Sequence, residues 1–406
     1  MTILADLGRA RPGDGVHAAG DRVEATYVVQ GVPDLEAAAR EIVVEESTGT
    51  LRAGPDAVAR VGGEVVSVEE AGSIDLALAS APLARAGVSA APVGRVTVAW
   101  PAENAASLPG LLTMVVGETT ERGVFGACRL VRLGVPDALL TDCGGPRRGI
   151  DGTRRALGVE GRPVVGAIVK PSTGLGPTEV ARVAASLAEG GCDFVKDDEL
   201  LGDPPHCPFA QRVPAVRAAL DAVEDRSGRR VAYAANVTGP LESFGRRLEI
   251  AADNDTGMVM LNAVVVGLDV LRWAARRAGQ PVFAHRVMGG ALTRSAAVGT
   301  SPGVLCGLTR VAGADLVQVG GVAGKIFEDD ATIAANADVC RRPLAGLRAA
   351  LPTSGGGQGV GTVAANAAVF GDARFCHLLG SVASDDPDGP VQAVRRVIAA
   401  WEGVSW

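Results

Sequence analysis

After residue 160 the sequence repeats one pattern, in which a short apolar run precedes a stretch with the spacing of an amphipathic helix. Two of these stretches are GPTEVARVAASLAEGG and PLESFGRRLEIAADND, whose apolar residues recur every three or four positions. Such alternation is typical of parallel strands joined by helices, and eight strands can close into a (β/α)8 TIM barrel. The eight runs are VVGAIVKPS, CDFVKDDE, VAYAANVT, GMVMLNAVVV, PVFAHRVM, ADLVQVGG, ALPTSGGG and HLLGSVA. We therefore predict a barrel with one strand in each run.

The first third of the chain has a different pattern. RVEATYVVQ (22–30) and GRVTVAWP (94–101) predict strands, and DLEAAAREIVVEES (34–47) predicts a helix that runs into a strand. The Gly/Pro/Arg-rich passage at 142–163 suits a domain junction. We therefore predict an α/β chain with two domains, a smaller α+β (ferredoxin-like) N-terminal domain over residues 1–145 and a (β/α)8 barrel catalytic domain over residues 146–406.

Composition excludes several classes of partner. The formal net charge is −7 and the basic residues are scattered, so no basic stripe is available for a nucleic-acid backbone. The longest apolar run, MVMLNAVVVGLDVL, is interrupted by Asn262 and Asp269 and is shorter than the roughly 20 residues that a membrane-spanning helix needs. Seven dispersed cysteines without a Cys-x-x-Cys pair indicate reduced thiols. We expect a cytoplasmic protein with no nucleic-acid partner and no membrane insertion.

The chemistry of a parallel barrel lies on the loops that follow its strands. The charged and glycine-rich segments of this chain fall at those positions: Lys170 after the first run, Lys196 to Glu199 after the second, His285 and Arg286 after the fifth, 320–325 after the sixth and SGGG (354–357) after the seventh. We expect these polar groups to converge on one rim of the barrel. The amides of SGGG are consistent either with an anion site or with a simple turn.

The sequence Lys196-Asp197-Asp198-Glu199 ends the second run. Strand alternation places Lys196 and Asp198 on one face and the other two acids on the opposite face, unless the strand end turns and brings Glu199 round. One interpretation is a buried salt bridge. The other is a magnesium site, because a lysine that has reacted with CO₂ carries a carbamate, which acts as a third carboxylate beside Asp198 and Glu199.

The segment GAIVKPSTGLGPTEVARVAASLAEGGCDFVKDDEL resembles the ribulose bisphosphate carboxylase large-subunit superfamily, and the resemblance extends from about Glu45 to the C-terminus. ESTGT (46–50), VFG (124–126), AHR (284–286), GGVAGK (320–325) and FGD (370–372) match the family in the same order. The resemblance implies an α+β domain followed by a barrel, and a homodimer or an assembly of dimers. It also implies Mg²⁺ held by a carbamylated Lys196 with Asp198 and Glu199.

The resemblance assigns roles to further residues. Lys170 aligns with the lysine that works as acid and base in enolisation, and Lys325 aligns with the lysine on a mobile loop that closes over the substrate. Glu45 and Thr50 align with residues that the partner subunit contributes to the site. We expect catalytic roles for Lys170, Lys196, His285 and Lys325, and substrate-binding roles for Glu45, Thr50, Arg286, Gln318, Gly356, Gly357 and Gly380.

Several positions depart from the pattern of the family's carboxylases. Ser172 stands in place of a second lysine, Gly123 in place of an asparagine, and Gln318 in place of a histidine. The serine after the seventh strand aligns with Gly355, or with Ser354 if a one-residue gap is introduced, and a triple-glycine turn is replaced by GSV (380–382). With these departures the chain resembles a RuBisCO-like protein. The metal and proton-transfer residues remain, whereas parts of the bisphosphate-binding and gas-addition sites are missing.

The predicted function is therefore that of a Mg²⁺-dependent enolate-forming enzyme of carbohydrate metabolism, acting on a keto sugar acid or a ketose-derived small molecule. Within this class we favour a β-keto acid decarboxylase, because the loss of a phosphate-binding turn indicates a substrate with at most one phosphate. The alternative is a sugar-phosphate isomerase or tautomerase. An authentic carboxylase is disfavoured by the departures above, and a non-catalytic scaffold by the joint presence of the lysines and acids.

Overall fold

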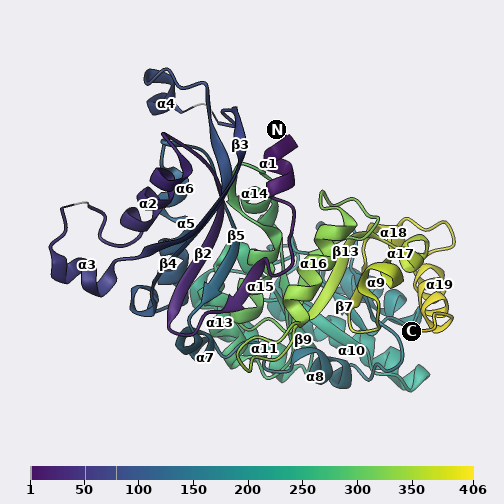
Figure 1. The fold of residues 1–406 in the computed structure, drawn as a ribbon. Helices are drawn as coiled ribbons and strands as arrows, with labels where there is room; N and C mark the ends of the chain where they lie inside the picture. The colour runs from purple at the N-terminus through teal and green to yellow at the C-terminus, as the bar shows by residue number, and fades with distance from the viewer. Residues whose placement is uncertain (1, 51, 79) are drawn as a thin grey trace. The chain divides into compact units, whose positions relative to one another are not determined.

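The computed structural model of the protein describes residues 2–50, 52–78 and 80–406, which form two units (Figure 1). The first unit contains the chain up to Gly144 together with Met288–Leu308 and Leu344–Leu347. The second unit contains Gly145–Val287, Thr309–Pro343 and Arg348–Trp406. Two short segments from the second half of the sequence thus belong to the first unit.

The first unit is built on a mixed sheet with the strand order β1-β5-β2-β4-β3, in which β11 also pairs with β5. The central pairs β2–β4 and β2–β5 are antiparallel, whereas β1 and β11 both run parallel to β5. The strands are β1 (Gly15–Ala18), β2 (Arg22–Gly31), β3 (Glu64–Asp75), β4 (Ala90–Pro101), β5 (Phe125–Val135) and β11 (Val298–Thr300). The predicted strands at 22–30 and 94–101 are confirmed, and this unit is an α+β domain.

Short helices accompany this sheet. They are α1 (Thr2–Leu7), α2 (Leu35–Glu45), α3 (Pro55–Val61), α4 (Ala81–Arg85), the 3₁₀ helix η1 (Ala102–Ala105), α5 (Leu108–Val116), α6 (Glu118–Glu121), α7 (Asp137–Cys143) and α14 (Gly289–Thr293).

The prediction of a helix running into a strand over 34–47 was half wrong, because α2 continues to Glu45 and residues 46–50 form turns instead of a strand. The Asp34 side chain caps the helix by accepting a hydrogen bond from the amide of Ala37 at 2.7 Å. Ile42 and Val43 are buried with the residues one turn before them. Burial of this face outweighs the strand preference of the β-branched residues.

The second unit is a closed barrel of eight parallel strands in the order β10-β12-β13-β14-β6-β7-β8-β9. Each of the eight predicted runs contains a strand, so the (β/α)8 prediction is confirmed. The strands are β6 (Val164–Ile168), β7 (Phe194–Lys196), β8 (Ala232–Asn236), β9 (Gly257–Asn262), β10 (Val282–His285), β12 (Leu316–Gly320), β13 (Leu351–Gln358) and β14 (Cys376–Leu379). The SGGG segment belongs to β13 itself, where the register with β14 shifts between Gly355 and Gln358.

The helices outside the barrel follow the predicted βα rhythm. They are α8 (Gly149–Ala156), α9 (Pro177–Glu189), α10 (Phe209–Ser227), η2 (Leu241–Ser243), α11 (Phe244–Asp253), α12 (Ala263–Val266), α13 (Leu268–Arg277), α16 (Asp330–Arg341), η3 (Val360–Thr362), α17 (Val363–Phe370), α18 (Ser381–Ser384) and α19 (Pro390–Glu402). The helix α15 (Pro302–Val311) precedes β12 in the sequence, and its residues up to Leu308 belong to the first unit.

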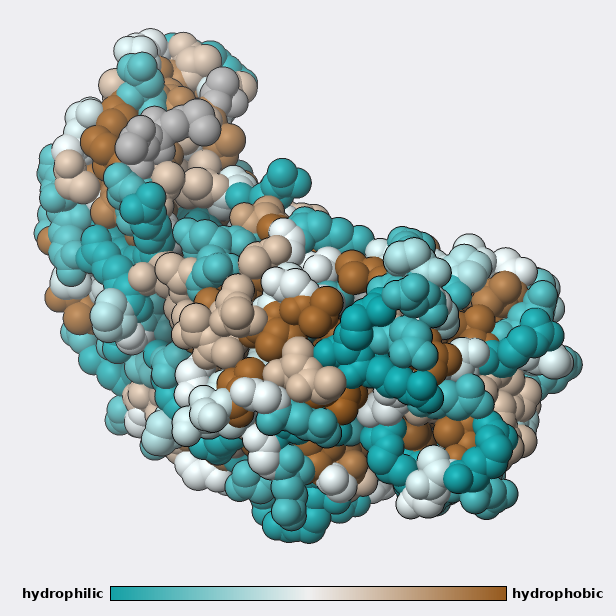
Figure 2. All heavy atoms as spheres, turned by 90° about the vertical axis from the view of Figure 1, so that its right-hand side faces the viewer, coloured by the Kyte–Doolittle hydropathy of each residue, from teal (hydrophilic) through white to brown (hydrophobic). Residues whose placement is uncertain are grey.

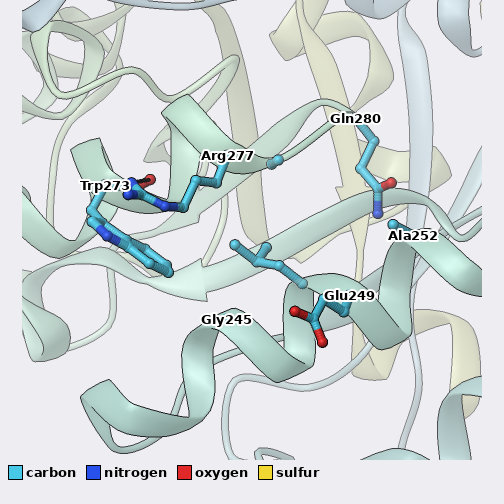
Figure 3. A pocket seen from close by; sticks show the side chains of 9 residues that line it. Gly245, Glu249, Ala252, Trp273, Arg277 and Gln280 are labelled. Atoms are coloured by element: carbon cyan, nitrogen blue, oxygen red, sulfur yellow. Dashed lines mark hydrogen bonds between the residues drawn. The ribbon is translucent and has the colours of Figure 1, made fainter.

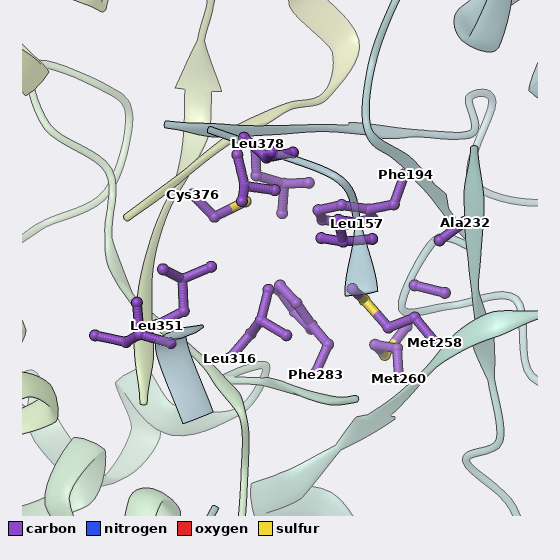
Figure 4. Packing of buried hydrophobic residues seen from close by; sticks show 14 residues of the cluster. Leu157, Phe194, Ala232, Met258, Met260, Phe283, Leu316, Leu351, Cys376 and Leu378 are labelled. Atoms are coloured by element: carbon purple, nitrogen blue, oxygen red, sulfur yellow. The ribbon is translucent and has the colours of Figure 1, made fainter. Parts of the chain in front are cut away.

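The barrel core is filled by apolar side chains from all eight strands. Figure 4 shows Phe194, Phe283, Leu316 and Leu351 gathered between the strands, together with the sulfur-containing side chains of β9. Leu157, from the end of α8, packs against the same cluster. The Gly/Pro/Arg-rich passage at 142–163 is therefore more than a junction, because it forms a helix and supplies apolar side chains to the barrel core.

A buried polar network holds the end of β7. The Asp197 carboxylate accepts hydrogen bonds from the Tyr233 hydroxyl at 2.6 Å and from the Asn236 amide at 2.9 Å. It also forms an ion pair with Arg212 of α10 at 3.2 Å, and both side chains are fully buried. Burial, and after it the charge of Asp197, raises the pKa of Tyr233 well above its ordinary value, so the phenol stays protonated and donates. The network joins β7 to β8 and to α10.

The surface drawn in Figure 2 mixes hydrophilic side chains with small hydrophobic patches. None of the helices in the part of the chain that the structure describes combines the length and the apolar character of a membrane span. Cytoplasmic localisation stays a prediction.

We predict that Asp197→Asn lowers the free energy of unfolding by about 3 kcal/mol or more, because it leaves the buried Arg212 guanidinium without a counter-charge. Asp221→Asn is the matched control. Its carboxylate pairs with Arg217 but is 53% exposed, and its loss is expected to cost less than about 1 kcal/mol. Urea unfolding followed by circular dichroism measures both changes, and equal shifts in the two variants would contradict the assigned importance of the network.

Candidate active site

The second barrel strand ends with a buried lysine. Lys196 is the last residue of β7, and its side chain is fully buried. Its ammonium nitrogen donates to the carbonyl oxygen of Asp197 at 2.6 Å and lies 3.5 Å from Glu199 Oε2. Burial lowers the pKa of the Lys196 amine, with the nearby carboxylates acting in the opposite direction. The shift favours the neutral amine, which is the form that reacts with CO₂.

Glu199 is turned toward Lys196 by the asparagines that end the next two strands. The Asn236 side-chain amide donates to the carbonyl oxygens of Asp198 and Glu199 at 3.2 and 3.3 Å. The Asn262 side-chain amide donates to the Glu199 carbonyl at 2.9 Å. With the backbone held in this turn, Glu199 and Asp198 both contact lysines of the barrel rim, whereas Asp197 contacts α10.

The first strand contributes the second lysine. Lys170 lies two residues beyond β6, and its Nζ donates to Asp198 Oδ2 at 2.6 Å and to the Ser172 hydroxyl at 2.9 Å. Its side chain is 23% exposed, whereas that of Asp198 is 1% exposed. Lys170 is therefore anchored at its charged end and keeps one side open to solvent, as a group that exchanges a proton with a substrate requires.

His285 completes the cluster from the end of β10. Its Nδ1 accepts the amide hydrogen of Val287 at 3.1 Å, so Nε2 carries the ring proton. Nε2 lies 3.5 Å from Glu199 Oε2. Burial, and after it the positive charge of Lys196, lowers the pKa of His285 well below its ordinary value. The imidazole is neutral and presents one N–H donor to the cluster.

Arg286 and Gln318 lie beside this cluster. The Arg286 amide lies 3.5 Å from Gln318 Oε1, and the Arg286 guanidinium forms an ion pair with Glu328. Gln318 Nε2 also lies 3.0 Å from the position that a Cβ on Gly355 would occupy. A larger residue at position 355 would therefore displace the Gln318 side chain.

The predicted mobile loop contacts the glycine segment of β13. The Lys325 amide donates to the Gly356 carbonyl at 3.2 Å, and the Lys325 side chain is exposed. Gly356 and Gly357 have φ values of +105° and +81°, which other residues rarely adopt. The buried Ser354 hydroxyl accepts the Val322 amide hydrogen at 3.3 Å. The serine therefore contacts the start of the loop that carries Lys325.

The remaining predicted residues lie elsewhere. Gly380 follows β14 and is partly exposed. Glu45 and Thr50 belong to the first unit, where Glu45 pairs with Arg122 at 3.3 Å and the Thr50 hydroxyl accepts the Arg52 amide hydrogen at 3.2 Å. Their predicted contribution to the active site of a partner subunit stays a prediction.

Four polar residues of this region were not among the predicted site residues. They are Ser172, Asn236, Asn262 and Glu328. Each lies at or just beyond the end of a barrel strand or in the loop of Lys325, and this position was the available signal. Sequence spacing gave no indication that Glu328 would reach Arg286, which lies 42 positions earlier.

The cluster fits a metal ion only if Lys196 takes part. Among residues 2–50, 52–78 and 80–406, no three His, Cys, Asp or Glu side chains form a group that could hold a metal ion. Glu199 Oε2 is nevertheless buried without a hydrogen-bond partner, and the side-chain oxygen of Asn262 shares this property. A carbamate on Lys196 would add anionic oxygens beside Glu199 and Asp198, a donor set that Mg²⁺ favours.

A separate hollow of about 320 Å³ lies between α11 and α13. Figure 3 shows Trp273 and Arg277 of α13 on one side and Glu249 of α11 on the other, with Gln280 at the edge. The guanidinium carbon of Arg277 lies 4.2 Å from the centre of the Trp273 ring. Residues 278–280 precede β10, so this hollow lies at the strand beginnings, whereas the lysines and acids described above lie at the strand ends.

Comparisons with known proteins agree with this architecture. Residues 149–405 match the family described as the ribulose bisphosphate carboxylase large chain, catalytic domain. A rubisco-like protein from Burkholderia fungorum has a solved structure that superposes with a TM-score of 0.88 at 32% sequence identity, covering 94% of each chain.

Three curated relatives extend the similarity over almost the whole chain. An uncharacterized ribulose bisphosphate carboxylase-like protein of Bordetella bronchiseptica is 36% identical, covering 94% of this chain and 92% of the relative. A 3-oxo-isoapionate-4-phosphate transcarboxylase/hydrolase of Xanthobacter autotrophicus is 34% identical, covering 94% and 93%. A 3-oxo-isoapionate-4-phosphate decarboxylase of Rhizobium rhizogenes is 28% identical, covering 93% and 91%. The chain therefore belongs to the RuBisCO large-chain superfamily, as a RuBisCO-like protein distant from the authentic RuBisCOs.

Proposed function

We propose that this protein is a Mg²⁺-dependent enzyme that forms an enolate from a 3-oxo sugar acid with at most one phosphate, and that its net reaction is decarboxylation. The observation that carries the proposal is the cluster at the ends of β6 and β7, where Lys170 contacts Asp198 and Lys196 lies beside Glu199. Support for the substrate class comes from two relatives that are named for 3-oxo-isoapionate 4-phosphate.

The residues that would hold Mg²⁺ are a carbamylated Lys196, Asp198 and Glu199. Glu199 Oε2 supports this assignment, because it is buried, lies 3.5 Å from both Lys196 and His285, and makes no hydrogen bond that a bound ion would have to break. When bound, the ion would stabilise the negative charge that develops on the keto oxygen of the substrate.

In the proposed reaction, the bond between the α-carbon and the carboxylate breaks, CO₂ leaves, and the bonding electrons move onto the keto oxygen. Lys170 then gives its proton to the α-carbon and is reprotonated from solvent, which reaches its partly exposed side chain. Asp198 and Ser172 keep the Lys170 ammonium in place during this transfer. The Nδ1 atom of His285 is occupied by the Val287 amide, so Nε2 of the neutral ring would donate a hydrogen bond to an oxygen of the substrate.

A second candidate is an isomerase or tautomerase. It uses the same enolate, but Lys170 first removes a proton from carbon instead of a carboxylate leaving. The position of Lys170 serves both reactions, because a group that protonates carbon also deprotonates it in the reverse direction. We favour decarboxylation because relatives of this chain are named for carboxyl-group chemistry on a 3-oxo acid.

We further propose a homodimer, or an assembly of dimers, whose active sites are shared. Glu45 and Thr50 resemble residues that the family's partner subunit supplies, and both belong to the first unit. An isologous dimer places the same surface of each subunit against the other, so each N-terminal domain would complete the barrel site of its partner.

Incubation with 3-oxo-isoapionate 4-phosphate in D₂O tests the activity, with CO₂ release and deuterium at the α-carbon measured by NMR. We expect turnover that requires Mg²⁺, is enhanced by preincubation with bicarbonate, and is abolished in Lys196→Ala and in the charge-matched Lys196→Arg. Lys170→Met is expected to lower the rate about 10²- to 10⁴-fold. Deuterium exchange without CO₂ release would favour the isomerase. Full activity in chelated, CO₂-free buffer would show that the metal and carbamate assignment is wrong.

Subunit mixing tests the shared site. Glu45→Gln and Lys196→Ala dimers are each expected to be inactive, whereas a hybrid dimer has one intact site. Random exchange should therefore restore about a quarter of the wild-type activity. Native mass spectrometry verifies that hybrids have formed, and hybrids without activity would count against sharing.

The protein is expected not to add CO₂ to ribulose bisphosphate. Ser172, Gly123, Gln318, Gly355 and the GSV turn occupy positions where the family's carboxylases have other donors or anion-binding groups. A missing hydrogen bond to a charged group costs roughly 1.5 to 3 kcal/mol, so several losses together remove many powers of ten in rate. The assay is incorporation of labelled bicarbonate into acid-stable product, with an authentic carboxylase as positive control. Sustained turnover would overturn this prediction.

A further inference from the structure

The positive charge of Arg286 is already neutralised within the chain. Its guanidinium Nη2 pairs with Glu328 Oε1, and the two side chains are 14% and 1% exposed. Arg286 directly follows β10, next to His285, whereas Glu328 ends the loop that carries Lys325. The pair therefore forms one end of the candidate active site.

The charges of the two side chains neutralise each other, but each side chain keeps one polar atom without a hydrogen bond. Arg286 Nη1 and Glu328 Oε2 are both buried, and neither has a hydrogen-bond partner. Most buried polar atoms in folded proteins have such a partner. An unused donor and an unused acceptor thus remain on two side chains that touch each other.

The chemistry around the pair disfavours an anion. Glu328 places a negative charge against the guanidinium. The centre of the Phe327 ring lies 5.9 Å from the guanidinium carbon, and the uncharged Gln318 side chain accepts from the Arg286 backbone amide at 3.5 Å. A phosphate would accept from Arg286, but its negative charge would be repelled by Glu328. A hydroxyl group can accept from Nη1 and donate to Oε2.

We propose that the Arg286–Glu328 pair binds a neutral, hydroxylated end of the substrate and excludes a phosphate from that end. The proposal rests on the proposed function, which places a sugar acid in the site. It adds that the end of the substrate beside Arg286 and Glu328 carries no phosphate. Both unpartnered atoms are enclosed, so the ligand reaches them when Phe327 shifts. This ring is 42% exposed and has solvent into which it can move.

Calorimetric titration with inorganic phosphate tests the exclusion. Glu328→Gln keeps the shape of the side chain and removes its charge, so phosphate affinity should rise about tenfold or more. The gain should disappear in the double variant Arg286→Gln/Glu328→Gln. Asp338→Asn removes the same charge from an exposed position of α16 and should leave phosphate affinity unchanged.

Saturation-transfer NMR with erythritol, a neutral polyol, tests the binding half of the proposal. Erythritol affinity should fall about tenfold in Glu328→Ala, which removes the acceptor. Two further results would overturn the proposal. One is unchanged phosphate affinity in a Glu328→Gln protein with a wild-type melting temperature, and the other is unchanged erythritol affinity in Glu328→Ala.

One comparison does not depend on the folding of the single variants. The double variant has the same net charge as the wild type, and it should bind phosphate no more weakly, because Arg286 is not available to phosphate in the wild type. Weaker binding by the double variant would overturn the proposal. No titration here requires turnover, so the proposed decarboxylation and the recognition by this pair can fail independently.

Discussion

The ion pair between Asp197 and Arg212 is the constraint on which the geometry of the candidate active site depends. A strand alternates its side chains, so a strand end with four consecutive charged residues must direct some of them away from the barrel interior. Arg212 forms its ion pair with Asp197 on the outer side of the barrel. It also donates to the Gly202 and Cys207 carbonyls of the loop after β7. With Asp197 held there, Asp198 is directed toward Lys170. The inner and outer charges are thus separated by the pleat of one short strand.

The inner charges are arranged so that each basic group has an acidic neighbour. Lys170 has Asp198, Lys196 and His285 share Glu199, and Arg286 has Glu328. Such pairing limits the uncompensated charge that is buried in this region. Addition of CO₂ to Lys196 would turn one of these bases into an anion, and the excess negative charge would then require a cation. The proposed dependence on Mg²⁺ follows from this change in charge.

Sequence patterns were sufficient for the barrel and insufficient for parts of the N-terminal sheet. The barrel strands are buried on both faces and therefore stand out as apolar runs. Strand β3 is largely exposed and rich in acids, so its sequence EVVSVEEAGSID carries no such signal. The strand-end rule located Lys170, Lys196, Asp198 and His285, whose proximity follows from barrel closure. The Arg286–Glu328 contact depends on the path of an irregular loop, which no periodicity encodes.

The pairing of β11 with β5 has a consequence for the synthesis of the chain. Val298 lies opposite Cys128 in the first sheet, although 169 residues that include five barrel strands separate them. An N-terminal sheet emerging from the ribosome therefore lacks one strand until more than half of the barrel has been translated. Its β5 edge stays without that neighbour during this interval, and exposed strand edges are sites of mispairing. Deleting the barrel would leave the same edge open, so the N-terminal unit cannot be isolated intact as one contiguous fragment.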